Sequence, residues 1–210
     1  LADGLRRFVL VPDGTIDAWR LVCRFAASAV AVGAQIRTWA RVTGIETEGG
    51  CVAAVVYEDV TTGTVHRERC DVVVNAGGAW AGRIASFAGC TLDVTPSPGT
   101  MVAFAGRLTN MVVSRLHPPG DGDIVVPQRL FSIVGSTQRL SDDPDRSDVS
   151  VEDVEILREA GARLVPGIAN APIRAAWAAP RPRAGDVRGT TTGPGSLSRG
   201  FVSVDHGVSD

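Results

Sequence analysis

The chain has 210 residues, 44% of them apolar, which is enough to bury the core of one large domain or of parts of two. Its formal net charge of −2 creates no positive field, so we exclude nucleic acid as a partner. No apolar run approaches the roughly 18 residues of a membrane span. No signal peptide is visible at the N-terminus either, and we expect a cytoplasmic location.

The first third of the chain predicts one helix followed by antiparallel strands. Thr15 or Asp17 can cap a helix over residues 18–32, where apolar residues recur at helical spacing, and Gly33 ends it. We expect strands at 35–39, 42–48, 51–59 and 65–70, with hairpin turns at Gly49-Gly50 and at 61–64.

The run from Asp71 to Trp80 passes from an apolar, β-branched segment directly into two glycines. Residues 72–74 predict a strand buried on both faces, as in a parallel sheet covered by helices. Gly77 and Gly78 lack Cβ atoms, so the backbone there can turn tightly and lie against a cofactor. A helix expected over 80–88 would direct its first N–H groups at an anion such as a pyrophosphate. A tight turn without a ligand is the alternative that this run alone leaves open.

From Thr91 onward, short segments broken by proline and glycine predict an antiparallel sheet. Ser150 can cap a helix over 151–164, with Asp153 in a variant of the capping box, and Pro166-Gly167 end it. The expected strands are 91–95, 99–104, 111–116, 123–127, 130–135, 173–179 and 201–205, with solvated loops at 141–150 and 183–196.

No two of the four cysteines form a C-x-x-C pair, so we expect no metal site. We expect buried thiols and no disulfides. All 21 basic residues are arginine, and a lysine base or Schiff base is therefore excluded within this chain.

Eight short blocks, in order along the chain, resemble the FAD-dependent glycerol-3-phosphate dehydrogenases, and most of all the A subunit of the anaerobic, membrane-associated enzyme. They are 12–17 with Arg20-Leu21, 40–45, 73–80, 96–100, 123–127, 133–137, Arg181-Pro182, and 198–202 with Asp205-His206. The resemblance implies the α/β (α+β) class, with the middle part of a two-dinucleotide-binding-type FAD domain and an antiparallel-sheet substrate domain.

The resemblance also implies a domain order. Residues 1–90 would be the central part of the FAD-binding domain, 91–179 the antiparallel β substrate domain with one helix, and 180–210 a return segment toward the FAD domain. The chain lacks the G-x-G-x-x-G turn and the Gly-Gly-Lys segment of the family. We therefore expect a fragment of a longer enzyme that is inactive in isolation.

In such an enzyme FAD would accept a hydride from sn-glycerol 3-phosphate, giving dihydroxyacetone phosphate, and electrons would pass to quinone. Arginine suits the phosphate because its planar fork binds two oxygens at once, and Arg181 and Arg199 match arginines of the family. A surface ion pair is the alternative for each. Thr137 is a candidate for a hydroxyl contact to substrate or, equally, for a strand-edge hydrogen bond. His206 is the candidate base, or else an anchor at a strand end.

On the cofactor side, the resemblance places the backbone of Val42 beside the adenine. It also implies that FAD is lined by Asn75, Ala76, Gly77, Gly78 and Trp80. Through the longer enzyme, the implied partners are a quinone or a membrane-anchor subunit, with a peripheral location at the inner face of the cell membrane.

Two further hypotheses remain open at this point. One is an FAD-dependent amino-acid or 2-hydroxy-acid oxidase of the same superfamily, which would bind a carboxylate with the same arginines. The other is a non-catalytic binding or assembly module that kept the fold. Chemistry alone does not separate a phosphate from a carboxylate substrate.

Overall fold

The computed structural model describes residues 7–115 and 124–184, together with Val204 and His206. The chain forms two compact units. One consists of the described parts of 1–25 and 97–180, and the other of the described parts of 26–96 and 181–210. The sheet order is β1-β2-β3 in a three-stranded sheet and β5-β6-β7-β4-β8 in a five-stranded sheet.

The first helix, α1 (Ala18–Ala31), confirms the helix predicted over 18–32 to within one residue. The side chain of Asp17 caps it, since Asp17 Oδ1 accepts a hydrogen bond of 3.3 Å from the backbone N–H of Arg20. Gly33 ends it with a positive φ of 97°, which favours glycine. No residue of α1 is buried, so the predicted apolar stripe has no cover within the described residues.

The three-stranded sheet is an antiparallel meander of β1 (Ala40–Glu48), β2 (Cys51–Asp59) and β3 (Thr64–Arg69). Both predicted hairpins are confirmed. Gly49 and Gly50 both have positive φ, as a tight two-residue hairpin requires. The strand predicted at 35–39 is wrong: this segment is irregular, and Trp39 has a φ of 60°, outside the range of a strand.

The five-stranded sheet confirms the antiparallel sheet predicted from Thr91 onward. Its strands are β4 (Val94–Ala105), β5 (Val113–Ser114), β6 (Ile124–Gln128), β7 (Phe131–Gly135) and β8 (Ile173–Ala184). The segments expected at 91–95 and 99–104 join into the single strand β4. Met101 of β4 pairs with Gly135 of β7, and this register continues to Ala105 opposite Phe131.

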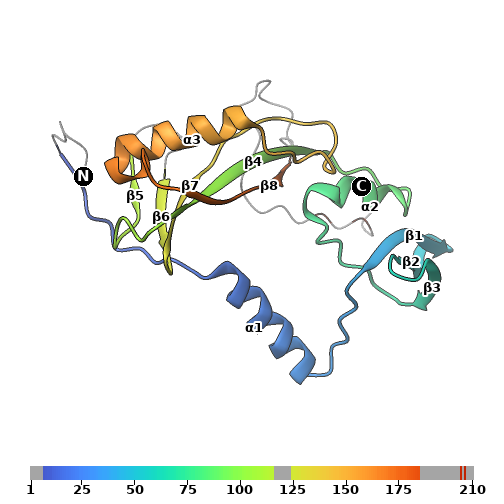
Figure 1. The fold of residues 1–210 in the computed structure, drawn as a ribbon. Coiled ribbons are helices and arrows are strands. Elements are labelled where there is room, and N and C mark those ends of the chain that lie inside the picture. The colour runs from blue at the N-terminus through green and yellow to red at the C-terminus, as the bar shows by residue number, and fades with distance from the viewer. Residues whose placement is uncertain (1–6, 116–123, 185–203, 205, 207–210) are drawn as a thin grey trace. The chain divides into compact units, whose positions relative to one another are not determined.

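Helix α3 (Val151–Leu164) runs along the five-stranded sheet, and the 3₁₀ turn η2 (Pro166–Ile168) follows it (Figure 1). Ser150 caps α3 as predicted, because its side chain accepts from the N–H of Asp153 at 3.0 Å. Between helix and sheet lies the apolar core, formed by Val102, Phe104, Val125, Val134, Leu157, Leu164, Val165, Ile168 and Ala171. This packing buries one face of the sheet.

Strand β8 corrects a second prediction. It continues to Ala184 although a stop was expected at Ala179, and Arg183 lies in the strand with 3% of its surface exposed, where a solvated loop was expected. Because β8 is an edge strand, Pro180 and Pro182 need not interrupt a ladder on its outer side. The remainder of that loop and most of the strand predicted at 201–205 lie outside the described residues; Val204 is not in a strand.

Candidate functional site

The segment before the two glycines is not a strand. Residues 72–74 are irregular, and the side chains of Val72 and Val74 are 75% and 86% exposed, so the predicted strand buried on both faces is wrong. A strand is stabilised by hydrogen bonds to a neighbour, and within residues 7–115 and 124–184 none pairs with this segment.

The glycine turn itself is formed, and Asn75 holds it together. Its side-chain Nδ2 donates to the carbonyl of Ala81 at 2.8 Å, and its Oδ1 accepts from the N–H of Gly77 at 3.1 Å. A Cβ at Gly77 would lie 2.4 Å from Ile84 Cδ1, so this position cannot take a larger residue without movement. Asn75 therefore connects the residues before the turn to the helix that follows it.

Gly78 has a φ of 57°, and among the described residues, its two chain neighbours aside, no heavy atom lies within 4 Å of the place where a Cβ would be. Its backbone is thus open on one side and can make close contact with a flat ligand. Ala76 is exposed, while Gly77 and Trp80 are half-buried. The described residues at this turn fit a cofactor contact made by backbone and small side chains.

The helix after the turn is shorter than predicted. In place of one helix over 80–88 there are a 3₁₀ turn, η1 (Gly78–Trp80), and α2 (Ala81–Ser86), whose last turn gives way to Gly89 at a φ of 73°. Six residues align few peptide dipoles, so the anion-binding helix terminus that the sequence predicted is at most weakly developed. The structure favours contacts from the turn over a contact from a helix end.

Val42 lies in β1, which contacts α2, so the strand and the glycine turn belong to the same unit. Val42 pairs with Tyr57 of β2, and the register shifts between Val42 and Gly44. Such a bulge leaves backbone groups outside the regular ladder. The structure thus brings Val42 and the residues of the turn into one unit.

The described residues do not bring all of the predicted substrate residues into one unit. Arg181 lies half-buried in β8, and His206 is exposed in a turn. Arg199 lies outside the described residues. Thr137 belongs to the other unit, where its side chain is buried and Thr137 Oγ1 accepts from the N–H of Thr100 at 3.0 Å.

Sequence reasoning missed a buried polar cluster around Asp153, which includes Thr100 and Arg139. Thr100 is the last residue of one of the resemblance blocks. That position was the only signal in the sequence that could have pointed to this cluster. The expectation of buried thiols is also wrong: the four cysteines are free, Cys23 and Cys51 are exposed, and the other two are half-buried.

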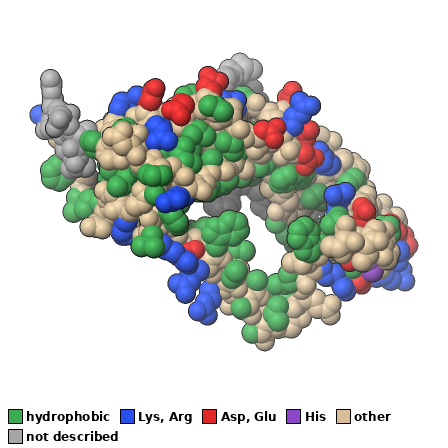
Figure 2. All heavy atoms as spheres, viewed as in Figure 1, with side chains coloured by type: hydrophobic (Ala, Val, Ile, Leu, Met, Phe, Trp, Pro, Cys, Tyr) green, Lys and Arg blue, Asp and Glu red, His purple; other side chains and the backbone are tan. Residues whose placement is uncertain are grey.

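The carboxyl groups whose pKa values are shifted lie on the surface, outside the predicted site. A hydrogen bond from Arg129 lowers the pKa of Asp17, and one from Arg67 lowers that of Glu46. A hydrogen bond from the Thr61 hydroxyl lowers the pKa of Asp59. Acidic and basic side chains are interspersed over the face in Figure 2. These hydrogen bonds stabilise local structure.

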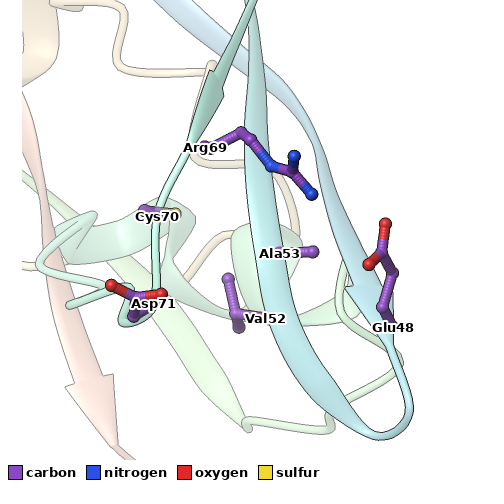
Figure 3. Close-up of a pocket in the computed structure, with 6 residues that line it drawn as sticks. All are labelled: Glu48, Val52, Ala53, Arg69, Cys70 and Asp71. Atoms are coloured by element: carbon purple, nitrogen blue, oxygen red, sulfur yellow. The ribbon is translucent and has the colours of Figure 1, made fainter.

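One hollow of about 330 Å³ lies on the three-stranded sheet. It is lined by Glu48, Val52, Ala53, Arg69, Cys70 and Asp71, and Figure 3 shows Glu48 and Arg69 extending toward one another. Two acidic side chains and one basic side chain line it, and the lining has no aromatic residue. We assign this hollow no ligand.

Two features are absent from the described residues. No group of three or more His, Cys, Asp or Glu side chains there is arranged to hold a metal ion. Across the same ranges, no helix combines the length and apolarity that crossing a bilayer requires.

The chain belongs to the family of FAD dependent oxidoreductases (DAO), whose family model matches residues 2–204. This confirms the family, the mixed α/β fold class and the cofactor FAD that the sequence blocks implied. The chain is 40% identical to the A1 subunit of the anaerobic glycerol-3-phosphate dehydrogenase of Haloferax volcanii, over 100% of this chain and 37% of that protein. It is 34% identical to the A subunit of the Escherichia coli K12 enzyme of the same name, over 96% of this chain and 37% of that protein.

Solved structures agree on the fold. The glycerol-3-phosphate dehydrogenase from Bacillus halodurans, complexed with FAD, matches 79% of this chain and 35% of its own, with a TM-score of 0.69 at 23% identity. A glycine oxidase from Geobacillus kaustophilus matches 78% of this chain and 42% of its own, with a TM-score of 0.64 at 27% identity. The chain thus spans little more than a third of the sequence relatives named above.

Proposed function

We propose that the protein containing this chain oxidises sn-glycerol 3-phosphate to dihydroxyacetone phosphate. The observation that supports this most is the 40% identity, over the whole chain, to the A1 subunit of an anaerobic glycerol-3-phosphate dehydrogenase. Glycine oxidases are more distant: the enzyme of Pseudomonas putida is 30% identical over 68% of this chain. The identity therefore favours a phosphorylated alcohol as the substrate.

On the cofactor side, the proposal assigns FAD contacts to Val42, Asn75, Ala76, Gly77, Gly78 and Trp80. Bound FAD would supply the hydride acceptor that no amino-acid side chain provides. Asn75 orders the turn through its two hydrogen bonds, and the open side of Gly78 leaves room for the ligand. The half-buried ring of Trp80 would cover one edge of the contact and exclude water.

On the substrate side, Arg199 and Arg181 hold the phosphate through their guanidinium forks. Arg181 is held between Pro180 and Pro182, which restrict its backbone and favour one placement of the side chain. His206 takes the proton from the hydroxyl that is oxidised, since a neutral imidazole nitrogen can accept one. The chain's residues thus bind, orient and deprotonate the substrate.

The proposal extends to domain roles and partners. Residues 1–90 serve as the central part of the FAD-binding domain, 91–179 as the substrate domain and 180–210 as a return segment. Electrons leave toward a quinone or a membrane-anchor subunit, with the enzyme peripheral at the inner face of the cell membrane. The isolated chain is inactive and binds FAD weakly, because the glycine turn supplies only part of a cofactor surface.

The second candidate is an FAD-dependent amino-acid or 2-hydroxy-acid oxidase. The likeness to glycine oxidases, at 27% identity and a TM-score of 0.64 for one solved structure, favours it. The same arginines would bind a carboxylate in this case. Substrate choice therefore separates the two candidates.

The test uses the complete FAD-loaded protein, its Arg199→Ala variant, and glycerol 3-phosphate, glycerol and glycine as substrates. We expect turnover of glycerol 3-phosphate, and a loss of about 30- to 150-fold in kcat/KM for it in the variant, or about 2–3 kcal/mol. Arg199→Lys should recover part of this loss. Turnover of glycine instead would favour the second candidate. Equal losses with glycerol and glycerol 3-phosphate would show that Arg199 does not bind the phosphate.

A further inference from the structure

A buried carboxylate lies away from the glycine turn, at the start of α3. The side chain of Asp153 is 3% exposed. Asp153 Oδ2 accepts from the hydroxyl of Thr100 at 3.0 Å, and Oδ1 accepts from Arg139 Nη2 at 2.5 Å. Burying a charge is costly unless it is paired and hydrogen-bonded, and both oxygens of Asp153 are engaged.

Thr100 links this carboxylate to Thr137. The N–H of Thr100 donates to Thr137 Oγ1 at 3.0 Å, and the N–H of Thr137 donates to the carbonyl of Thr100 at 3.2 Å. Both threonines are 2% exposed. They come from two different resemblance blocks, so these two blocks meet at one buried network.

Arg139 closes the network from the other side. Its backbone N–H donates to the carbonyl of Pro98 at 3.1 Å, and its Nη2 also reaches Ser150 Oγ at 3.2 Å. Ser150 in turn caps α3 at the N–H of Asp153. The single carboxylate therefore joins three segments: the middle of β4, residues 137–139 after β7, and the first turn of α3.

We propose that Asp153 is a positioning residue which, through Thr100 and Arg139, fixes residues 136–139 within the substrate domain. In this assignment Thr137 is part of the frame and does not contact substrate, because its side chain is buried and its hydroxyl oxygen accepts from the Thr100 N–H. The inference rests on the proposed function in one respect, namely that residues 91–179 serve as the substrate domain.

The geometry supports a role beyond holding α3 in place. An ordinary capping box would direct the third residue of the helix back to the cap N–H. Asp153 instead directs its carboxylate at β4 and Arg139. The two hydrogen bonds that Asp153 accepts therefore hold β4 and residues 137–139, and their loss should loosen these segments before it loosens α3.

The first test is hydrogen exchange of the complete FAD-loaded protein carrying Asp153→Asn, which keeps the shape and replaces one acceptor oxygen with a donor. The matched control is Glu152→Gln, which removes the same charge from the preceding residue. The side chain of Glu152 is 79% exposed, and its Oε2 lies 4.0 Å from Arg139 Nη2. We expect the amides of Thr137 and Arg139 to exchange at least about tenfold faster in Asp153→Asn and to be unchanged in the control. Equal exchange in both variants would overturn the proposal.

The second test is kinetic, with the same proteins and glycerol 3-phosphate. We expect KM to rise more than kcat falls in Asp153→Asn at unchanged FAD content. Thr137→Ser, which keeps the hydroxyl, should behave as the unmodified protein, and Thr137→Val should resemble Asp153→Asn. Faster exchange without any kinetic change would overturn the positioning role. If the unmodified protein does not oxidise glycerol 3-phosphate, the proposed function fails, but the exchange experiment still tests the network. If Asp153→Asn does not fold, Thr137→Val and Thr137→Ser take its place in both experiments.

Discussion

Replacing Asn75 by alanine should weaken FAD binding, because Asn75 orders the glycine turn. The change removes the donor to the Ala81 carbonyl at 2.8 Å and the acceptor for the Gly77 N–H at 3.1 Å. Each bond contributes about 1 kcal/mol net, so we expect a loss of about 2 kcal/mol in the ordering of the turn. If FAD binds only the ordered turn, this corresponds to about a 30-fold higher Kd.

Asn75→Asp separates the two bonds. The aspartate retains an acceptor for the Gly77 N–H but places a carboxylate oxygen against the Ala81 carbonyl, where the amide donated. Two acceptors in contact repel, so this variant should bind FAD no better than Asn75→Ala. The result would show that the connection to α2 carries the effect.

The assay is equilibrium titration of FAD into the apo form of the complete protein, followed by flavin fluorescence. Asn110→Ala is the matched control, since Asn110 is exposed and its side chain accepts a surface hydrogen bond from Arg107. Its Kd should equal that of the unmodified protein. An unchanged Kd in Asn75→Ala, or an equal rise in the control, would refute the reasoning.

Three further predictions concern stability. Gly161→Ala should destabilise the protein by about 1 kcal/mol in urea unfolding, because a Cβ 2.8 Å from Val134 Cγ2 overpacks the core by more than the helix gains. Arg158→Met should lower the unfolding free energy by about 1–3 kcal/mol, since Arg158 Nη1 donates to three carbonyls that follow α3 and its guanidinium lies over an aromatic ring of the core. Finally, the hydrogen bond from Arg67 lowers the pKa of Glu46 in the folded state, so its contribution is fully present above the ordinary value of 4.5 and is lost as pH falls through the folded pKa. A Glu46→Gln variant should therefore differ from the unmodified protein at neutral pH and match it in strong acid, and a constant difference across pH would count against this.

Local signals predicted much of the fold. The caps at Asp17 and Ser150 and the turn at Gly49-Gly50 each depend on a few neighbouring residues, and all three occur where the sequence placed them. The prediction of a strand at residues 72–74 was wrong because a strand needs a neighbouring strand to pair with, and local composition does not supply one. β8 continued past its predicted end because proline is tolerated on the open side of an edge strand.

The candidate site was predictable only where its signal is local. The glycine turn was found from two adjacent glycines, whose conformational freedom depends on no distant residue. The predicted length of the helix after it was wrong, because α2 ends at Ser86 and Gly89 adopts a positive φ. Asp153 was read as a capping residue because its partner Thr100 lies 53 residues away, a separation that no spacing rule covers.

The central proposal is that the protein containing this chain transfers a hydride from glycerol 3-phosphate to FAD. The most direct measurement is the visible flavin absorbance of the complete protein, mixed without oxygen with glycerol 3-phosphate or, separately, with glycine. The proposal predicts that glycerol 3-phosphate bleaches the flavin stoichiometrically and that glycine does not. A protein without flavin, or a flavin that glycine bleaches and glycerol 3-phosphate leaves oxidised, would contradict it.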